Sequence, residues 1–138
     1  MKNSFNVSSA PSPVGHYPHA KRVGGLLFLS GVGPRKGGSN VIPGVKLSGS
    51  GAILDYDIEA QCVSVFENIK HILESAGSSW NNIVDVTVFL TNIDADFNKY
   101  NETYKRYFSD PFPTRTTVEV GALPTPIAIE LKVIATLN

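Results

Sequence analysis

The sequence predicts an α+β domain in which two amphipathic helices cover one face of a mixed β-sheet. Apolar residues recur with a helical period over residues 58–76 and again over residues 94–108. Short apolar segments precede these two stretches, and segments rich in β-branched residues separate and follow them, which is typical of strands. A chain of 138 residues has the size of one domain, so we expect residues 1–138 to form a single unit.

The N-terminal part is predicted to combine an irregular lead-in with a short hairpin. Residues 1–18 contain three prolines and no helical or strand periodicity, so we expect them to be extended. Gly24-Gly25 separates the segments 20–23 and 26–30, each of which has the composition of a short strand. This arrangement predicts two antiparallel strands joined by a tight turn.

A long loop is predicted after the hairpin. Segment 31–51 contains two prolines and many glycines, which disfavours a regular element. A short strand inside it is predicted at 41–42 or at 45–47. Loops of this length within a domain are often functional, so we expect this one to contribute to a site.

The first helix is predicted over residues 55–76. Asp55 or Asp57 can cap its N-terminus, and Glu59 falls in the first turn, where the helix dipole favours a carboxylate. Gly77 is placed to adopt the left-handed conformation that ends many helices. The apolar face of this helix carries Ile58, Cys62, Val65, Phe66, Ile69, Ile72, Leu73 and Ala76.

A central strand, a second helix and two further strands complete the predicted domain. Segment 83–90 is dense in β-branched residues and predicts a buried strand. The second helix is predicted over 94–108, with Asp94 as its cap and an aromatic stripe in the core. The last strands are predicted over 115–120 and 127–135. The core face of the central strand is expected to carry Val84, Val86, Val88 and Leu90, and the aromatic stripe consists of Phe97, Tyr100, Tyr104, Tyr107 and Phe108.

The composition argues against several classes of function. Lys and Arg total 12, as do Asp and Glu, so the chain lacks the basic excess by which proteins bind nucleic acid. The one cysteine, Cys62, allows neither an intrachain disulfide nor a cysteine zinc cluster, and we expect a cytoplasmic protein. No signal-peptide pattern or membrane-spanning apolar stretch is present, so no membrane association is expected. His16 and His19 have no third ligand nearby, so we expect no metal site.

The last two strands hold the residues best suited to chemistry. If these strands pair as a hairpin, Thr117 lies opposite Glu130, and Arg115 lies diagonally across from it. This cluster is either a solvated ion pair or a site in which Arg115 binds a carboxylate and Glu130 activates water. In the second case the neighbouring guanidinium is expected to lower the pKa of Glu130.

Several segments of the chain resemble one known protein family. The most specific is 112–120, Phe-Pro-Thr-Arg-Thr-Thr-Val-Glu-Val, which contains Arg115. The other segments are 15–17, 29–31, 84–91, 100–104 and 129–130. Together they extend over nearly the whole chain and resemble the Rid (YjgF, endoribonuclease L-PSP) family.

The resemblance implies a chorismate-mutase-like fold and a homotrimer. Its clefts between subunits would hydrolyse enamines and imines to ketones and ammonia, without a cofactor or metal. Arg115 would bind the substrate carboxylate, and Glu130 would position water. Many family members have a cysteine where this chain has Thr117, so the resemblance does not imply thiol chemistry here. The residues implied to line the cleft are Tyr17, Ser30, Gly31 and Asn101.

Within the family, the chain is most similar to the 2-aminomuconate deaminases. This similarity rests on segments 17–22 and 113–117, on Ser30-Gly31 leading to Arg35, and on Gly44-Val45. The implied substrate is a dicarboxylate that would be converted to 4-oxalocrotonate, so a second cation is needed beside Arg115. Arg35, His19 or Arg22 is expected to supply it. The alternatives are a general 2-imino acid deaminase of the RidA type, an endoribonuclease or translation inhibitor, and a non-catalytic trimer that binds small carboxylates.

Overall fold

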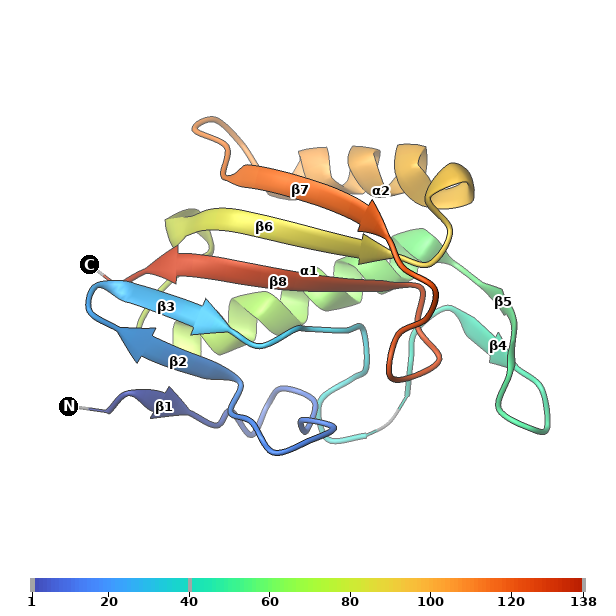
Figure 1. Cartoon of the computed structure of the whole chain (residues 1–138), viewed down its shortest axis with the longest axis horizontal. Coiled ribbons are helices and arrows are strands. Elements are labelled where there is room, and N and C mark those ends of the chain that lie inside the picture. The colour runs from blue at the N-terminus through green and yellow to red at the C-terminus, as the bar shows by residue number, and fades with distance from the viewer. Residues whose placement is uncertain (1, 40, 138) are drawn as a thin grey trace.

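The predicted two-layer α+β arrangement is confirmed by a computed structural model that describes residues 2–39 and 41–137. A six-stranded sheet forms one layer, and both long helices lie on the same face of it (Figure 1). The strands are β1 Ser4–Phe5, β2 Ala20–Val23, β3 Leu26–Leu29, β4 Val45–Leu47, β5 Ile53–Tyr56, β6 Ile83–Leu90, β7 Thr114–Glu119 and β8 Ile129–Thr136. The helices are α1 Ile58–Ser75 and α2 Ile93–Tyr107, with a 3-10 turn at Trp80–Asn82.

The main sheet has the order β1-β2-β3-β8-β6-β7. All neighbouring strands run antiparallel except β6 and β7, which are parallel. The hairpin β2–β3 confirms the prediction made from Gly24-Gly25. The lead-in is more regular than predicted, because Ser4 and Phe5 add a short strand to the edge of β2. Within the described residues, no helix is long and apolar enough to cross a membrane.

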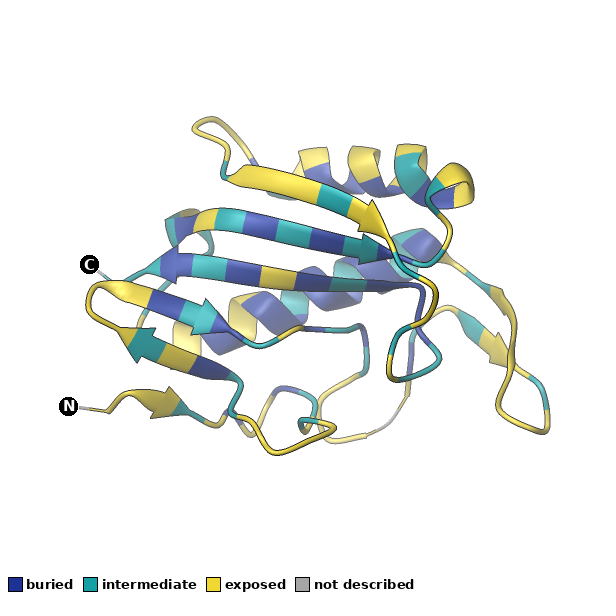
Figure 2. Ribbon diagram, in the orientation of Figure 1, coloured by how far each residue is buried: buried dark blue, intermediate teal, exposed yellow. Residues whose placement is uncertain are grey.

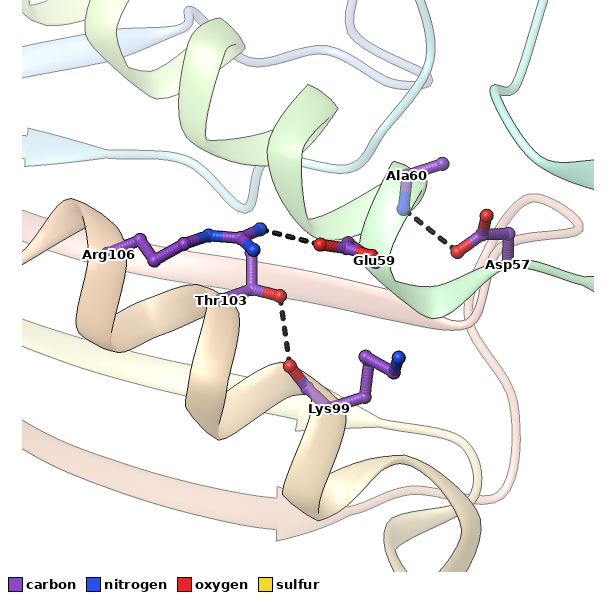
Figure 3. Close-up of polar contacts among 6 residues, drawn as sticks. All are labelled: Asp57, Glu59, Ala60, Lys99, Thr103 and Arg106. Atoms are coloured by element: carbon purple, nitrogen blue, oxygen red, sulfur yellow. Dashed lines mark hydrogen bonds and ion pairs between the residues drawn. The ribbon is translucent and has the colours of Figure 1, made fainter.

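Both ends of α1 carry capping residues that were predicted from the sequence. The side chain of Asp57 accepts a hydrogen bond from the Ala60 amide at 3.1 Å and caps the helix (Figure 3). Gly77 has a φ of 87°, the left-handed conformation predicted for the residue that follows the helix. Near its N-terminus, α1 is joined to α2 by an ion pair of 2.7 Å between Glu59 and Arg106 (Figure 3).

The strand predicted at 45–47 is present as β4, and it pairs with a strand that the sequence analysis missed. This second strand, β5, occupies residues that were partly assigned to the start of the helix. The β4–β5 hairpin projects from the body of the domain (Figure 1). The hydroxyl group of Tyr56 donates to the carboxylate of Asp96 at 2.6 Å and ties the base of the hairpin to α2.

The central strand β6 departs from the prediction at one residue. A register shift between Ile83 and Asp85 turns Val84 outward, and its side chain is 41% exposed. A bulge of this kind reverses the alternation of side chains locally, so the expected core position of Val84 was wrong. In α2, the cap is Asn92, whose side chain accepts from the Ala95 amide at 3.1 Å, rather than the predicted Asp94.

The core lies between the sheet and the two helices (Figure 2). Burial alternates along β8, since its odd-numbered residues from Ile129 to Ala135 are all buried. Cys62 is fully buried, as expected for a small core residue. The aromatic stripe of α2 also packs here, where Phe66 makes edge-on or tilted contacts with Tyr104, Tyr107, Phe108 and Trp80.

The predicted pairing of the last two strands is wrong, because β6 lies between β7 and β8. The unit β6-α2-β7 returns β7 parallel to β6, and the connection 120–128 is long enough to cross to the other side of β6. Thr117 therefore pairs with Val88, and Glu130 pairs with Phe89. Their side chains lie on opposite faces of the sheet.

Candidate functional site

Glu130 lines a small pocket at one end of the sheet, which we call the Glu130 pocket. Its volume is about 100 Å³. Tyr17, Gly31 and Arg35, which are among the predicted binding residues, lie here together with Glu130. The remaining lining residues, which the sequence analysis missed, are Val14, Gly33, Pro124, Thr125 and Ile127.

The main chain at Gly31 packs directly against the Glu130 carboxylate. A Cβ atom at this position would overlap Oε2 and would lie 3.0 Å from Cδ of Glu130. The approach is fixed by an isolated bridge, in which Val32 N donates to Leu131 O at 2.8 Å and Leu131 N donates to Val32 O at 3.0 Å. A side chain at residue 31 would therefore displace the carboxylate from this position.

The electrostatic environment of Glu130 differs from the expectation. Burial raises the pKa of Glu130, because a carboxylate loses hydration when it is enclosed. The predicted lowering of this pKa by Arg115 was wrong for a single chain, since Arg115 lies on the other face of the sheet. A carboxyl group with a raised pKa is a stronger base than an ordinary one and is suited to proton transfer near neutral pH.

Arg115 lies in a separate and wider cavity of about 470 Å³, which we call the Arg115 pocket. Its Nη1 atom donates to Oδ1 of Asn101 at 2.8 Å. The guanidinium carbon lies 5.3 Å from the ring centre of Tyr100 and 4.7 Å from that of Tyr104. Stacking on the two rings and the hydrogen bond to Asn101 hold the planar guanidinium group in an orientation suited to binding a carboxylate. The pocket is lined by Asn101, Glu102, Tyr104, Lys105, Phe112, Pro113 and Arg115.

The two tyrosines of α2 have a role that the sequence analysis did not assign to them. They were predicted as core residues, and they are buried, yet their rings also support Arg115. The spacing of Tyr100, Asn101 and Tyr104 could have indicated this, because residues three and four apart share a helix face. Thr117, which was predicted to lie opposite Glu130 in the site, lines neither pocket and instead shares a hydrogen bond of 2.8 Å with the Tyr100 hydroxyl.

The two pockets are not brought together within one chain. Arg115 lies opposite Val86 on β6, and Glu130 lies opposite Phe89. Their backbones are therefore offset by three residues along the strands and by two strand spacings across the sheet. Together these offsets give a separation of about 14 Å. Because their side chains also point to opposite faces of the sheet, the Arg115–Glu130 cluster predicted from strand pairing is wrong for an isolated chain.

Two of the predicted binding residues, Ser30 and His19, have structural partners instead. Ser30 donates to the carbonyl oxygen of Pro18 at 2.7 Å. Both ring nitrogens of His19 are engaged, since Nδ1 accepts from the Val7 amide at 2.9 Å and Nε2 lies 2.7 Å from the Pro11 carbonyl oxygen. His19 thus anchors the lead-in and is not free to bind a carboxylate.

Arg22, the third alternative for the second cation, lies far from the Glu130 pocket. It pairs with Leu27, which in turn pairs with Ala135, near the opposite end of β8. Its Nε atom donates to the carbonyl oxygen of Gly24 at 3.0 Å. Of the three cations considered, Arg35 is therefore the one that lines the same pocket as Glu130.

The fold and the two pockets define a small α+β protein with an arginine held for anion binding and a half-buried acid. A family model described as Endoribonuclease L-PSP matches residues 7–137. Over 135 residues the chain is 40% identical to a RutC family protein of Pyrococcus horikoshii, covering 98% of each chain. The chain therefore belongs to the endoribonuclease L-PSP family, the Rid (YjgF) family that its segments resemble.

Two further similar proteins have a name or title that mentions an activity or a bound ligand. The chain is 35% identical over 136 residues to Reactive Intermediate Deaminase A, chloroplastic, of Arabidopsis thaliana, covering 99% of this chain and 66% of that protein. The crystal structure of E. coli TdcF with bound serine has a TM-score of 0.83 and 31% identity, and it covers 99% of this chain and 100% of TdcF. These names do not support a specificity for 2-aminomuconate.

Proposed function

We propose that the protein is a deaminase that hydrolyses enamine or imine carboxylates to 2-oxo acids and ammonia. The observation that carries this proposal is the half-buried Glu130 carboxyl, whose pKa is raised by burial and which lines a pocket beside the main chain of Gly31. A group of this kind can hold water and exchange a proton with it. The name of the Arabidopsis relative, Reactive Intermediate Deaminase A, supports the same class of reaction.

The complete site would form between two copies of the chain. Arg115 and Glu130 lie on opposite faces of the sheet, so the Arg115 pocket of one copy has to meet the Glu130 pocket of another. A ring of three copies joined by identical head-to-tail interfaces would contain three such sites. This arrangement is the homotrimer that the family resemblance implies.

The proposed reaction combines addition of water, proton transfers and cleavage of the C–N bond. Arg115 binds the substrate carboxylate through its guanidinium group. Asn101 and the tyrosine rings fix the orientation of that group. An enamine takes up a proton at carbon to give an iminium ion, and water held by Glu130 adds to the C=N carbon. Glu130 takes a proton from the attacking water and returns it to the amino nitrogen of the carbinolamine. The C–N bond then breaks, ammonia leaves, and the hydroxyl group gives its proton to Glu130 as the 2-oxo acid forms.

The direct test is ammonia release from enamines generated in the assay. Glu130→Gln keeps the size of the side chain but cannot accept the proton, so we expect activity to fall by about 100-fold or more. Arg115→Ala should mainly weaken substrate binding. Undiminished ammonia release by Glu130→Gln would refute the proposed role of the acid.

Mixing Glu130→Gln with Arg115→Ala, at a substrate concentration at which each variant alone has low activity, tests the shared site. If each site takes Arg115 from one copy and Glu130 from another, random reassembly of equal amounts restores both groups in about a quarter of the sites. We therefore expect about a quarter of wild-type activity after denaturation and joint refolding. The same variants refolded separately and then combined serve as the control, and equal activity in both samples would exclude a shared site.

The finer proposal concerns a dicarboxylate substrate such as 2-aminomuconate. Its support is that Arg35 lines the Glu130 pocket and would stand opposite the carboxylate bound by Arg115. Arg35→Ala should then reduce activity on a dicarboxylate enamine by about tenfold and spare a monocarboxylate enamine. Equal losses on both substrates would leave the general 2-imino acid deaminase as the proposed function.

Ribonuclease activity is the second candidate, because the family model carries the description Endoribonuclease L-PSP. The formal net charge of zero disfavours it, since RNA binding gains affinity from basic residues. RNA cleavage by purified protein that is lost in Glu130→Gln would favour this activity. Ligand binding without ammonia release would instead favour the non-catalytic carboxylate-binding trimer.

A further inference from the structure

A row of polar side chains on α1 is buried beneath the loop that contains Gly31 and Arg35. Gln61, Ser64 and Asn68 follow one another at intervals of three and four residues, so they share a helix face. Their exposed fractions are 0%, 5% and 5%, respectively. Polar groups are costly to bury unless they form hydrogen bonds. The hydrogen-bond partners of these three side chains therefore show which part of the chain they hold in place.

Two members of this row hold the carbonyl groups of three consecutive loop residues. The Nδ2 atom of Asn68 donates to the carbonyl oxygen of Gly33 at 3.0 Å and to that of Arg35 at 2.8 Å. Ser64 donates to the carbonyl oxygen of Pro34 at 2.7 Å. Asn68 is therefore the side chain of this row that directly fixes the main chain of Arg35.

Arg35 is held at both of its ends. Its main chain is bound by Asn68, and its Nη2 atom donates to the carbonyl oxygen of Ser12 at 2.7 Å. A guanidinium group has five N–H donors, so four remain for other acceptors. Arg35 also lines the Glu130 pocket, so these two contacts hold it in place beside a ligand there.

We propose that Asn68 is a positioning residue that sets the preference of the Glu130 pocket for ligands with a second carboxylate. Asn68 acts through Arg35 and lies outside both pockets, so its loss should weaken dicarboxylate binding and spare monocarboxylates. This inference rests on the proposed role of the Glu130 pocket in binding carboxylate substrates.

The test compares the affinities of a dicarboxylate and a monocarboxylate by isothermal titration calorimetry. The ligands are 2-oxoglutarate and pyruvate, which are stable and carry the 2-oxo acid group of the expected products. We expect wild-type protein to prefer 2-oxoglutarate, and Asn68→Ala to reduce this preference by about fivefold or more. In an Arg35→Ala background, Asn68→Ala should cause no further change.

The controls separate positioning from general destabilisation. Ser64→Ala removes a buried hydrogen bond on the same helix that does not involve Arg35, so the preference should persist. Asn68→Ser keeps a short donor and replaces Asn68→Ala if that variant does not fold, with the same expected direction. The ratio of two affinities is independent of the fraction of folded protein.

Three results would overturn the inference: equal losses for both ligands, no dicarboxylate preference in the wild type, or a further loss in the Arg35→Ala background. Absence of ammonia release by the wild-type protein would refute the proposed deaminase activity. The ratio of affinities would still test the role of Asn68, because it is measured by binding alone.

Discussion

Replacing Gly31 by alanine tests how closely the main chain must approach Glu130. The added Cβ atom would lie 3.0 Å from Cδ and 3.5 Å from Cγ of Glu130, and closer still to Oε2. Carbon atoms in contact are normally about 3.5–4.0 Å apart, so the carboxyl group has to move by about 1 Å. A displacement of this size at a reacting group lowers kcat/KM by about 100-fold.

Stability should change little in the Gly31→Ala variant, which separates its effect from unfolding. Gly31 is not among the described glycines with positive φ, so alanine is not strained there and should alter the free energy of unfolding by only about 1 kcal/mol. Gly25→Ala is the matched control, because its Cβ meets no atom within 4 Å. Ammonia release and urea denaturation are measured for both variants. Near-normal activity in Gly31→Ala, or equal losses in both, would refute the reasoning.

Three further predictions concern single side chains. The raised pKa of Glu130 means that the folded chain holds its proton to higher pH than the unfolded chain, so stability falls as pH rises through that interval. Glu130→Gln should flatten this fall in urea denaturation measured across pH. Burial raises the pKa of Cys62 to about 12, so thiol reagents should label it only after unfolding. His19→Ala should cost about 1–3 kcal/mol and expose the lead-in to proteases, because Val7 and Pro11 lose their partner.

The sequence was most informative where local chemistry decides the structure. The cap at Asp57, the end of α1 at Gly77 and the turn at Gly24-Gly25 each depend on residues close in the chain. The alternation along β8 was also predictable, because one face of that strand packs on the helices. The face of Arg115 was not predictable in this way, because Arg115 lies on the helix side of the sheet and not on the side of Glu130.

The pairing of the strands was not predictable from these local patterns. Nothing in the composition of 115–120 or 127–135 indicates that β6 lies between them, because pairing depends on how α2 packs on the sheet. The bulge that exposes Val84 is a similar case, since it arises from the register with β8. The expected contact between Arg115 and Glu130 failed for this reason, whereas the residues around each of them were partly identified.

The two helices each support one pocket, which explains why polar and aromatic residues interrupt their apolar faces. On α2, Tyr100 and Tyr104 stack against Arg115, and Asn101 binds its guanidinium. On α1, Asn68 holds the Arg35 loop, and Gln61 accepts from the amide of Ala128 at 2.9 Å, just before the strand that carries Glu130. Side chains from rigid helices thus fix both pockets on opposite faces of one sheet. Changes at Asn68 or Gln61 should therefore alter the Glu130 pocket while leaving Arg115 in place, and a change at Asn101 should do the reverse.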